Sequence, residues 1–334
     1  MSDFVQQQSV ECRFESFDSW VILSPIEQSI KRKIESVGTP LKDWDIQINY
    51  GIKTGFNDAF IISTEKRNEI LDNCSSEEER TKTAELIRPI LRGRDIKRYG
   101  YDWANLWLIA TFPSRHYNIE EFPAVKAHLL SFGKERLEQT GKKYIINGEE
   151  IKARKKTSNK WFETQDSISY WDDFLQPKLI YPETTQGAFF AYDETGIFLD
   201  KTCFMMITKY ARYIQATLSS QLFEFAYKRI FSCIELWQHG FQYNKHALIK
   251  LPIKRFNEDD STIFSEEFFY NQYGITKGEI VYTKCYLIST NPTSSLSSFD
   301  KSYRSKIIVS IAMAFDFVYS FCISKSWSKN NALV

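Results

Sequence analysis

The sequence has little glycine, proline or cysteine and almost no net charge. Its 334 residues include 13 Gly and 9 Pro, too few for a collagen-like or low-complexity chain. The 6 cysteines form no Cys-x-x-Cys pair, and no histidine stands at metal-ligand spacing from them, which is typical of a reduced cytoplasmic protein. The balance of 43 Lys and Arg against 42 Asp and Glu at first argues against a nucleic-acid binder.

Signals for secretion and membrane insertion are also missing. The first 15 residues contain no apolar segment of signal-peptide type, so we expect a cytoplasmic location. The run from Ile307 to Ile323 approaches membrane-spanning length, but Asp316 stands at its centre, where a charge is costly. We interpret this run as a buried or partner-binding helix and expect no contact with a membrane. Hydrophobic residues make up 43% of the chain, enough to bury a sizeable core.

Motifs of the common enzyme classes are absent as well. There is no Gly-rich phosphate loop, no Gly-x-Ser-x-Gly, no His-Glu-x-x-His and no kinase signature. Glu150-Ile151-Lys152 fits half of the pattern by which metal-dependent nucleases hold Mg²⁺, but no suitable Asp precedes it. The pair Asp172-Asp173 is typical of a solvated turn or helix cap. We therefore expect no catalytic residue and no metal site, with a nuclease using Glu150 and Lys152 as an alternative.

Hydrophobic periodicity predicts a mixture of helices and strands. Ser24 opens a capping box with Glu27 and begins an amphipathic helix. Further helices are expected at 122–140, 210–230 and 266–273, and strands at 46–50, 59–62, 178–181, 188–192 and 203–208. Residues 46–62 are expected to form a hairpin, and 141–160 a mobile loop. This order predicts an α+β (mixed α/β) fold, a mixed, largely non-parallel sheet with flanking helices.

Two segments carry a more specific signal, NYGIKTGFNDAFII at 49–62 and LIRPILRGRDIKRY at 86–99. Together with Leu218-Ser219-Ser220, Leu251-Pro252-Ile253 and FFYNQYGITKGEI at 268–280, they follow one another in the order of a known family. The chain resembles the TaqI-like C-terminal specificity domain, the target recognition domain of type IIG restriction-modification enzymes and related adenine-N6 DNA methyltransferases. The resemblance extends over roughly 18 to 284.

The sequence departs from this family in two ways. The family's enzymes carry a methyltransferase core with an FxGxG-like loop for S-adenosylmethionine and an Asn-Pro-Pro-Tyr/Phe motif, and neither motif is present here. Residues 285–334 also do not follow the family pattern. The resemblance therefore implies target recognition without methyl transfer, with S-adenosylmethionine bound only by a partner. We predict a specificity domain over 1–255 and a C-terminal helical region over 256–334, whose segment 285–334 is unassigned.

Charge is unevenly distributed along the chain. Residues 85–160 hold 16 Lys and Arg against 9 Asp and Glu, whereas 256–300 hold 2 against 7. Basic clusters of this kind neutralise DNA phosphates, and arginine also reads guanine. The predicted DNA-binding residues are Lys53, Thr54, Asn57, Arg92, Arg94, Lys97, Arg98, Lys152, Arg154, Lys155, Lys156 and Lys160.

Each group of predicted contacts has a structural alternative. Arg92 to Arg98 can form a solvated face or ion pairs with Asp95, and 152–160 can be an ordinary flexible loop. Lys53, Thr54 and Asn57 can serve as hydrogen-bonding residues in a turn.

The sequence as a whole predicts a sequence-specific double-stranded DNA recognition module of a restriction-modification or phage-defence system. It would direct a methyltransferase or endonuclease subunit. The expected partners are therefore double-stranded DNA and that subunit. A truncated remnant that acts only in protein interaction is a second alternative to the recognition module.

Overall fold

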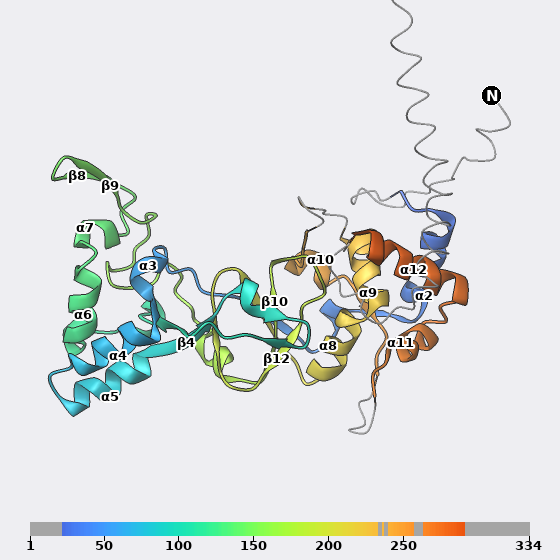
Figure 1. Cartoon of the computed structure of the whole chain (residues 1–334), viewed down its shortest axis with the longest axis horizontal. Coiled ribbons are helices and arrows are strands. Elements are labelled where there is room, and N and C mark those ends of the chain that lie inside the picture. Colours follow the sequence, from blue (N-terminus) through green and yellow to red (C-terminus); the bar gives the residue numbers. More distant parts are fainter. Residues whose placement is uncertain (1–21, 233–235, 237–239, 257–262, 291–334) are drawn as a thin grey trace, which may run out of the picture.

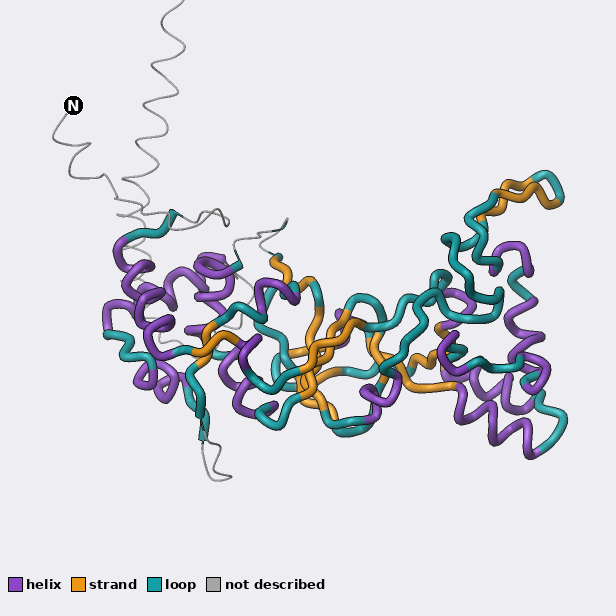
Figure 2. Tube along the Cα trace, turned by 180° about the vertical axis from the view of Figure 1, so that it is seen from behind, coloured by secondary structure: helices purple, strands orange, loops and turns teal. Residues whose placement is uncertain are grey.

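The computed structural model describes residues 22–232, 236, 240–256 and 263–290. Strands occupy the middle of an elongated molecule, and helices gather at both ends (Figures 1 and 2). The apolar run from Ile307 to Ile323 lies outside the described residues. Within the described ranges, no helix combines the length and apolar character needed to cross a membrane.

The central sheet has four strands in the order β12-β10-β14-β2, and every neighbouring pair is antiparallel. The strands are Ala191–Asp193, Lys178–Pro182, Cys203–Ile207 and Gln47–Tyr50. Leu179 and Tyr181 of β10 face one hydrophobic core, whereas Ile180 faces the other. Since side chains alternate along a strand, this sheet is buried on both faces and joins the two halves of the molecule.

The second sheet belongs to the half that contains β3 to β9. Its order is β13-β4-β7-β3, with β13 and β4 parallel and the other pairs antiparallel. The strands are Phe198–Leu199, Ile87–Leu91, Leu106–Ile109 and Ile61–Ser63. Around it lie α3 (Asn57–Phe60), α4 (Thr64–Asp72), α5 (Glu77–Leu86), α6 (Pro123–Leu130) and α7 (Lys134–Leu137). The mixed, largely antiparallel sheets confirm the predicted α+β class.

The opposite half is helical. It contains α2 (Pro25–Val37), α8 (Ala211–Ser219), α9 (Gln221–Ala226), α10 (Lys245–Leu248), α11 (Glu266–Gln272) and α12 (Lys277–Thr290), with a π-helical turn at Tyr227–Phe231. The predicted capping box of α2 is present, with the Ser24 amide donating to Glu27 at 2.7 Å. Lys33 of α2 forms an ion pair with Glu279 of α12 at 2.6 Å. Burial raises the pKa of Glu279, but hydrogen bonds from Lys33, Thr276 and Ser29 lower it to about 2.

Residues on both sides of the predicted boundary near residue 255 share one core. Phe269, Tyr270 and Tyr273 of α11 and its C-terminal end lie in the same cluster as Tyr213 and Phe223. The division into 1–255 and 256–334 stays a prediction.

Four two-stranded sheets complete the part of the fold that the structure describes. They pair β1 with β16, β11 with β15, β5 with β6 and β8 with β9. Their bounds are Thr39–Pro40 with Pro252–Ile253, Thr184–Thr185 with Phe241–Gln242, Ile96–Lys97 with Gly100–Tyr101, and Lys143–Ile146 with Glu149–Lys152. Short 3-10 segments lie at Leu41–Asp43, Gly93–Asp95, Pro113–Arg115, Ile119–Glu121 and Trp171–Leu175.

The expected hairpin over 46–62 is wrong. β2 pairs with β14 and β3 pairs with β7, so the two segments lie in different sheets. The chain between them runs against 199–203, where the Gly51 amide donates to the Cys203 carbonyl at 2.9 Å. A Cβ atom on Gly51 would lie 1.8 Å from the Asp200 carbonyl oxygen, so this crossing requires glycine.

Three other predicted elements differ in detail. The segment 141–160 contains the β8–β9 hairpin. The helix expected over 122–140 is divided into α6 and α7. The helix expected over 210–230 breaks at Ser220, whose hydroxyl accepts from the Phe223 amide and caps α9. A single apolar stripe runs through both halves of that segment, so periodicity alone does not reveal the break.

Candidate nucleic-acid interface

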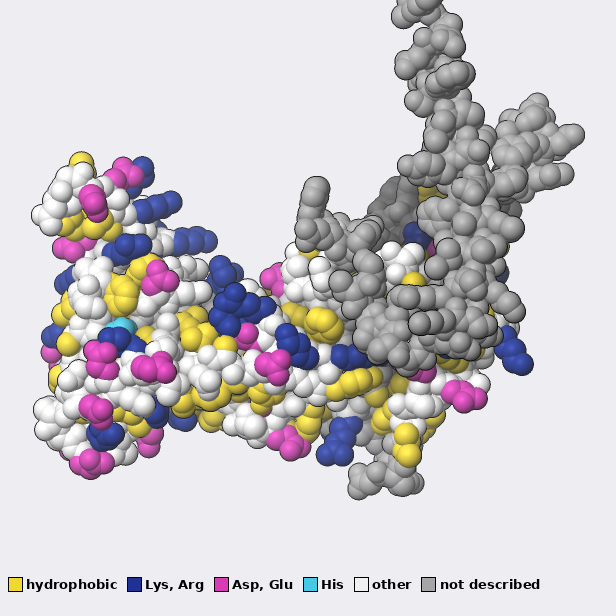
Figure 3. Space-filling model, in the orientation of Figure 1, with side chains coloured by type: hydrophobic (Ala, Val, Ile, Leu, Met, Phe, Trp, Pro, Cys, Tyr) yellow, Lys and Arg dark blue, Asp and Glu magenta, His cyan; other side chains and the backbone are white. Residues whose placement is uncertain are grey.

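A group of exposed lysines extends along β9 and the loop that follows it. We call this group, Lys152, Lys155, Lys156 and Lys160, the lysine loop, and all four side chains are exposed. Lysine and arginine side chains gather along the edge that runs from the β8–β9 hairpin toward the middle of the molecule (Figure 3). Lys152, Lys155 and Lys156 form no ion pair with any other residue in the described part of the chain. Their charges are therefore available to an external anion.

Arg154 lies within this loop but points into the protein. Only 4% of the residue is exposed, and its guanidinium donates to four carbonyl oxygens. The acceptors are Leu137 at 2.8 Å, Thr54 at 2.8 Å, Glu163 at 2.8 Å and Trp161 at 2.6 Å. Burial lowers the pKa of Arg154 to about 10, so the group stays charged at neutral pH. Arg154 fastens the base of the loop, and its burial keeps the guanidinium away from an external ligand.

Gln139 supports the same loop from the other side. Its Nε2 donates to the carbonyls of Lys160 at 3.1 Å and Glu163 at 3.0 Å, and its Oε1 accepts from Thr157 at 2.8 Å. No sequence pattern indicated this role, because a single buried glutamine follows no periodicity. Together Gln139 and Arg154 hold a segment with no regular secondary structure in one conformation.

The loop at 53–57 is attached to the lysine loop through Arg154. Thr54 is buried, and its hydroxyl donates to Asn57 Oδ1 at 2.6 Å, so both side chains serve the turn. Lys53 is exposed, while its carbonyl accepts from the Gln165 amide at 3.1 Å. The structure thus brings Lys53 to the segment that carries the lysines and places Thr54 in the interior.

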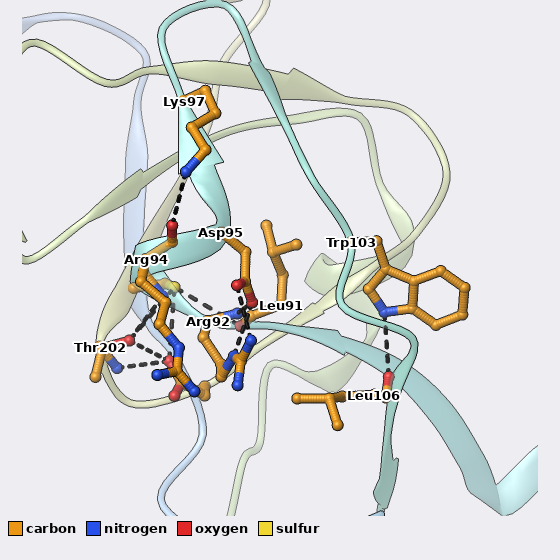
Figure 4. A network of polar contacts seen from close by, with 11 residues as sticks. Leu91, Arg92, Arg94, Asp95, Lys97, Trp103, Leu106 and Thr202 are labelled. Atoms are coloured by element: carbon orange, nitrogen blue, oxygen red, sulfur yellow. Dashed lines mark hydrogen bonds and ion pairs between the residues drawn. The ribbon is translucent and has the colours of Figure 1, made fainter. Parts of the chain in front are cut away.

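The second predicted cluster, which we call the arginine turn, comprises Arg92, Arg94, Lys97 and Arg98. Figure 4 labels the first three of these residues. Arg92 forms a two-pronged ion pair with Asp95, with Nε to Oδ2 and Nη2 to Oδ1 both at 2.9 Å. Burial raises the pKa of Asp95, but the hydrogen bonds and charge of Arg92 outweigh it and hold the value below the usual range. The turn itself is tight, because a Cβ atom on Gly93 would lie 2.8 Å from the Thr202 carbonyl oxygen.

The other members of the arginine turn differ in how they are bound. Arg98 donates to the Ser219 carbonyl and to Glu266, both in the helical half. Arg94 and Lys97 are exposed, and Lys97 Nζ donates to the Arg94 carbonyl at 3.1 Å. Tyr99, which we did not predict, is also exposed and adopts a left-handed φ of 69° at the tip of the β5–β6 turn. Tyr99 is distinguished by this backbone angle, and no pattern in the sequence indicates it.

The two carboxylate motifs occupy ordinary structural positions. Glu150 forms an ion pair with Lys143 at 2.9 Å on the exposed β8–β9 hairpin. Asp173 accepts from Gln47 at 2.6 Å and Asn49 at 2.7 Å, which attaches its 3-10 turn to β2. The described residues contain no group of three or more His, Cys, Asp or Glu side chains that could hold a metal ion.

The comparison with known families concerns the stretch from β4 to β16. Residues 88–253 match the sequence model of the TaqI-like C-terminal specificity domain. This part of the chain belongs to that family. The specificity domain therefore contains both the arginine turn and the lysine loop, while Lys53, Thr54 and Asn57 precede it.

The solved structures that are similar to this chain include two restriction enzymes. One is described as the type IIG restriction endonuclease BpuSI, with a TM-score of 0.45, 12% identity, and coverage of 76% of this chain and 28% of that one. The other is described as the type IIL restriction-modification enzyme MmeI in complex with DNA, with a TM-score of 0.43, 14% identity, and coverage of 83% and 36%. This chain thus spans about a third of the length of each.

Proposed function

We propose that this chain is a sequence-specific double-stranded DNA recognition module of a restriction-modification or phage-defence system. The observation that carries the proposal is the lysine loop. This loop is an exposed cationic surface on a specificity domain, and Arg154 holds its base from inside the protein. A rigid support matters because a pre-ordered loop loses less conformational entropy when it binds.

Binding would proceed in two parts. Lys152, Lys155, Lys156, Lys160 and the neighbouring Lys53 contact phosphates and position the module, which carries no sequence information in itself. Base edges are then read by other exposed groups of the same domain. Arg94 and Lys97 of the arginine turn extend the basic surface.

A partner subunit would supply the chemistry. We propose that the module directs an adenine-N6 methyltransferase or endonuclease, which flips the target base and alone binds S-adenosylmethionine. Co-purification of the chain with the product of a neighbouring methyltransferase gene tests this step. A stable complex supports the split arrangement, and its absence with intact DNA binding favours a module that acts without this partner.

The DNA-binding step is tested by fluorescence anisotropy with a 30-base-pair duplex of random sequence. We expect binding at low salt that weakens steeply between about 50 and 200 mM, because each phosphate contact contributes about 0.9 to the log-log slope. Failure to bind at low ionic strength would overturn the proposal. Addition of Mg²⁺ to the same reaction tests the nuclease alternative, which requires cleavage that is lost in Glu150→Ala.

A further inference from the structure

The β8–β9 hairpin is a two-stranded ribbon that projects from the end of the molecule beside α7 (Figure 1). The strands are antiparallel, with partners from Lys143 and Lys152 at the base to Ile146 and Glu149 at the tip. Asn147 and Gly148 form the turn with φ values of 52° and 86°. These two positive values suit the two-residue turns that follow the natural twist of a hairpin. Neither strand pairs with another strand in the described part of the chain.

The ribbon has two different faces. Tyr144, Ile146 and Ile151 are half-buried on one face, and Tyr144 lies opposite Ile151. The other face, which we call the outer face, carries the exposed residues Lys143, Ile145, Glu150 and Lys152. Ile145 is 82% exposed and lies opposite Glu150. Ile145 therefore presents an apolar, β-branched side chain to the outside on a hairpin that no third strand covers in the described part of the chain.

The charge around the ribbon indicates which kind of molecule it binds. Residues 142–160 contain 7 Lys and Arg against 2 Glu, and six of the seven cations are exposed. A cationic rim around one apolar side chain complements a polyanion with an apolar feature between its charges. The major groove of DNA has this composition, with phosphates on both edges and thymine methyl groups on its floor. Its width also admits a two-stranded β-ribbon.

We infer that the β8–β9 hairpin enters the major groove of the bound duplex with its outer face toward the bases, and that Ile145 sets base preference through contact with a thymine methyl group. The inference rests on the proposed function and deepens it by naming the reading element. Lys143 and Lys152 at the base of the ribbon then lie near the phosphates, and the lysine loop follows the same strand.

The experiment compares full-length wild type, Ile145→Ser and the matched control Ile263→Ser by selection from a random duplex pool, followed by sequencing. Ile263 is 85% exposed, so both variants lose an equally accessible isoleucine. Wild type and the control should select the same site. Ile145→Ser should bind the random pool as well as wild type, with the same salt slope, but discriminate at one thymine position about fivefold less, the lower end of the cost of one mismatched pair.

A second measurement locates the contact. Replacing that thymine by deoxyuridine removes only the methyl group, so it should weaken wild type about fivefold and leave Ile145→Ser unchanged. Unaltered site preference in Ile145→Ser would overturn the inference while the proposed function stands. The inference also fails if Ile145→Ser instead loses a methyltransferase partner, because the ribbon would then be a protein-binding element. If wild type binds no duplex, the proposed function itself fails.

Discussion

The arginine turn and the lysine loop look alike in the sequence and differ in the structure. Each places four or five cations within a short segment. In the arginine turn, Arg92 is held by the buried Asp95 and Arg98 by groups of the helical half. In the lysine loop, the four lysines are exposed, whereas Arg154 is buried and donates to four internal carbonyl oxygens.

The difference follows from the chemistry of the two side chains. A guanidinium offers five donors in a rigid fork, so it satisfies several carbonyl or carboxylate oxygens at once inside the protein. The lysine ammonium is a compact, strongly hydrated charge that remains in water unless an acceptor is close. In this chain Arg92, Arg98 and Arg154 therefore make contacts within the protein, Arg94 is the exception, and the lysines of the lysine loop supply free charge.

The largest effect is expected for Arg154→Ala. The substitution removes four hydrogen bonds to carbonyl groups, of which, among the described residues, only that of Glu163 keeps a second donor, Gln139, and it removes the hydrogen bond between the 53–57 loop and the lysine loop. We expect a loss of about 3–5 kcal/mol in the free energy of unfolding, since each unsatisfied buried polar group costs about 1–3 kcal/mol. Urea unfolding followed by circular dichroism measures it.

Lys155→Ala is the matched control for that substitution. It removes a cation one position along the chain, from an exposed side chain, and should change the free energy of unfolding by less than about 0.5 kcal/mol. Equal losses in the two variants would contradict the structural role assigned to Arg154.

The next effect concerns DNA rather than stability. The triple variant Lys152→Ala, Lys155→Ala, Lys156→Ala should weaken binding to a random duplex about tenfold to a hundredfold and reduce the log-log salt slope by up to about 2.7. Its thermal midpoint should match that of wild type, because none of the three lysines has an internal ion pair among the described residues. A salt slope that stays at the wild-type value would place the phosphate contacts elsewhere on the protein.

The strands of the central sheet and the capping box of α2 could be predicted from the sequence because those features are local. The short apolar run within 178–181 and the Ser24 to Glu27 spacing each require only a few neighbouring residues. The false hairpin at 46–62 shows the limit, since its two strands find partners more than 40 residues away. The same limit applies to the site. Whether a cation is free depends on acceptors such as the Thr54 carbonyl, which lies 100 residues before Arg154.

A smaller effect is expected for Asp95→Asn. It breaks the pair with Arg92 and should lower the free energy of unfolding by about 1–2 kcal/mol at pH 7. Because the pKa of Asp95 is lower in the folded state, its stabilisation is complete above the unfolded value near 3.8 and is lost as the pH falls through the folded value. The difference between wild type and variant should therefore shrink below about pH 4. Urea unfolding at pH 7, 5 and 3 measures the free energy of unfolding of both proteins. A difference between them that grows at low pH would contradict the predicted direction.

The smallest effect on DNA is expected when both partners of that pair are removed together. The double variant Arg92→Gln, Asp95→Asn leaves the net charge unchanged and deletes a cation that is already neutralised within the turn. We expect its affinity for a random duplex to stay within about twofold of wild type, because only counterion-releasing contacts change the electrostatic part of binding. The charge-neutral comparison in the other region is Lys155→Gln combined with Glu267→Gln in α11. It removes one free cation and an exposed carboxylate that has no ion pair in the described part of the chain, and it should weaken binding more. Anisotropy at 100 mM salt, well below the melting temperature of each variant, compares the two. A tenfold loss in the Arg92 variant would show that its guanidinium leaves Asp95 for a phosphate or a guanine, and that the two basic clusters act alike on DNA.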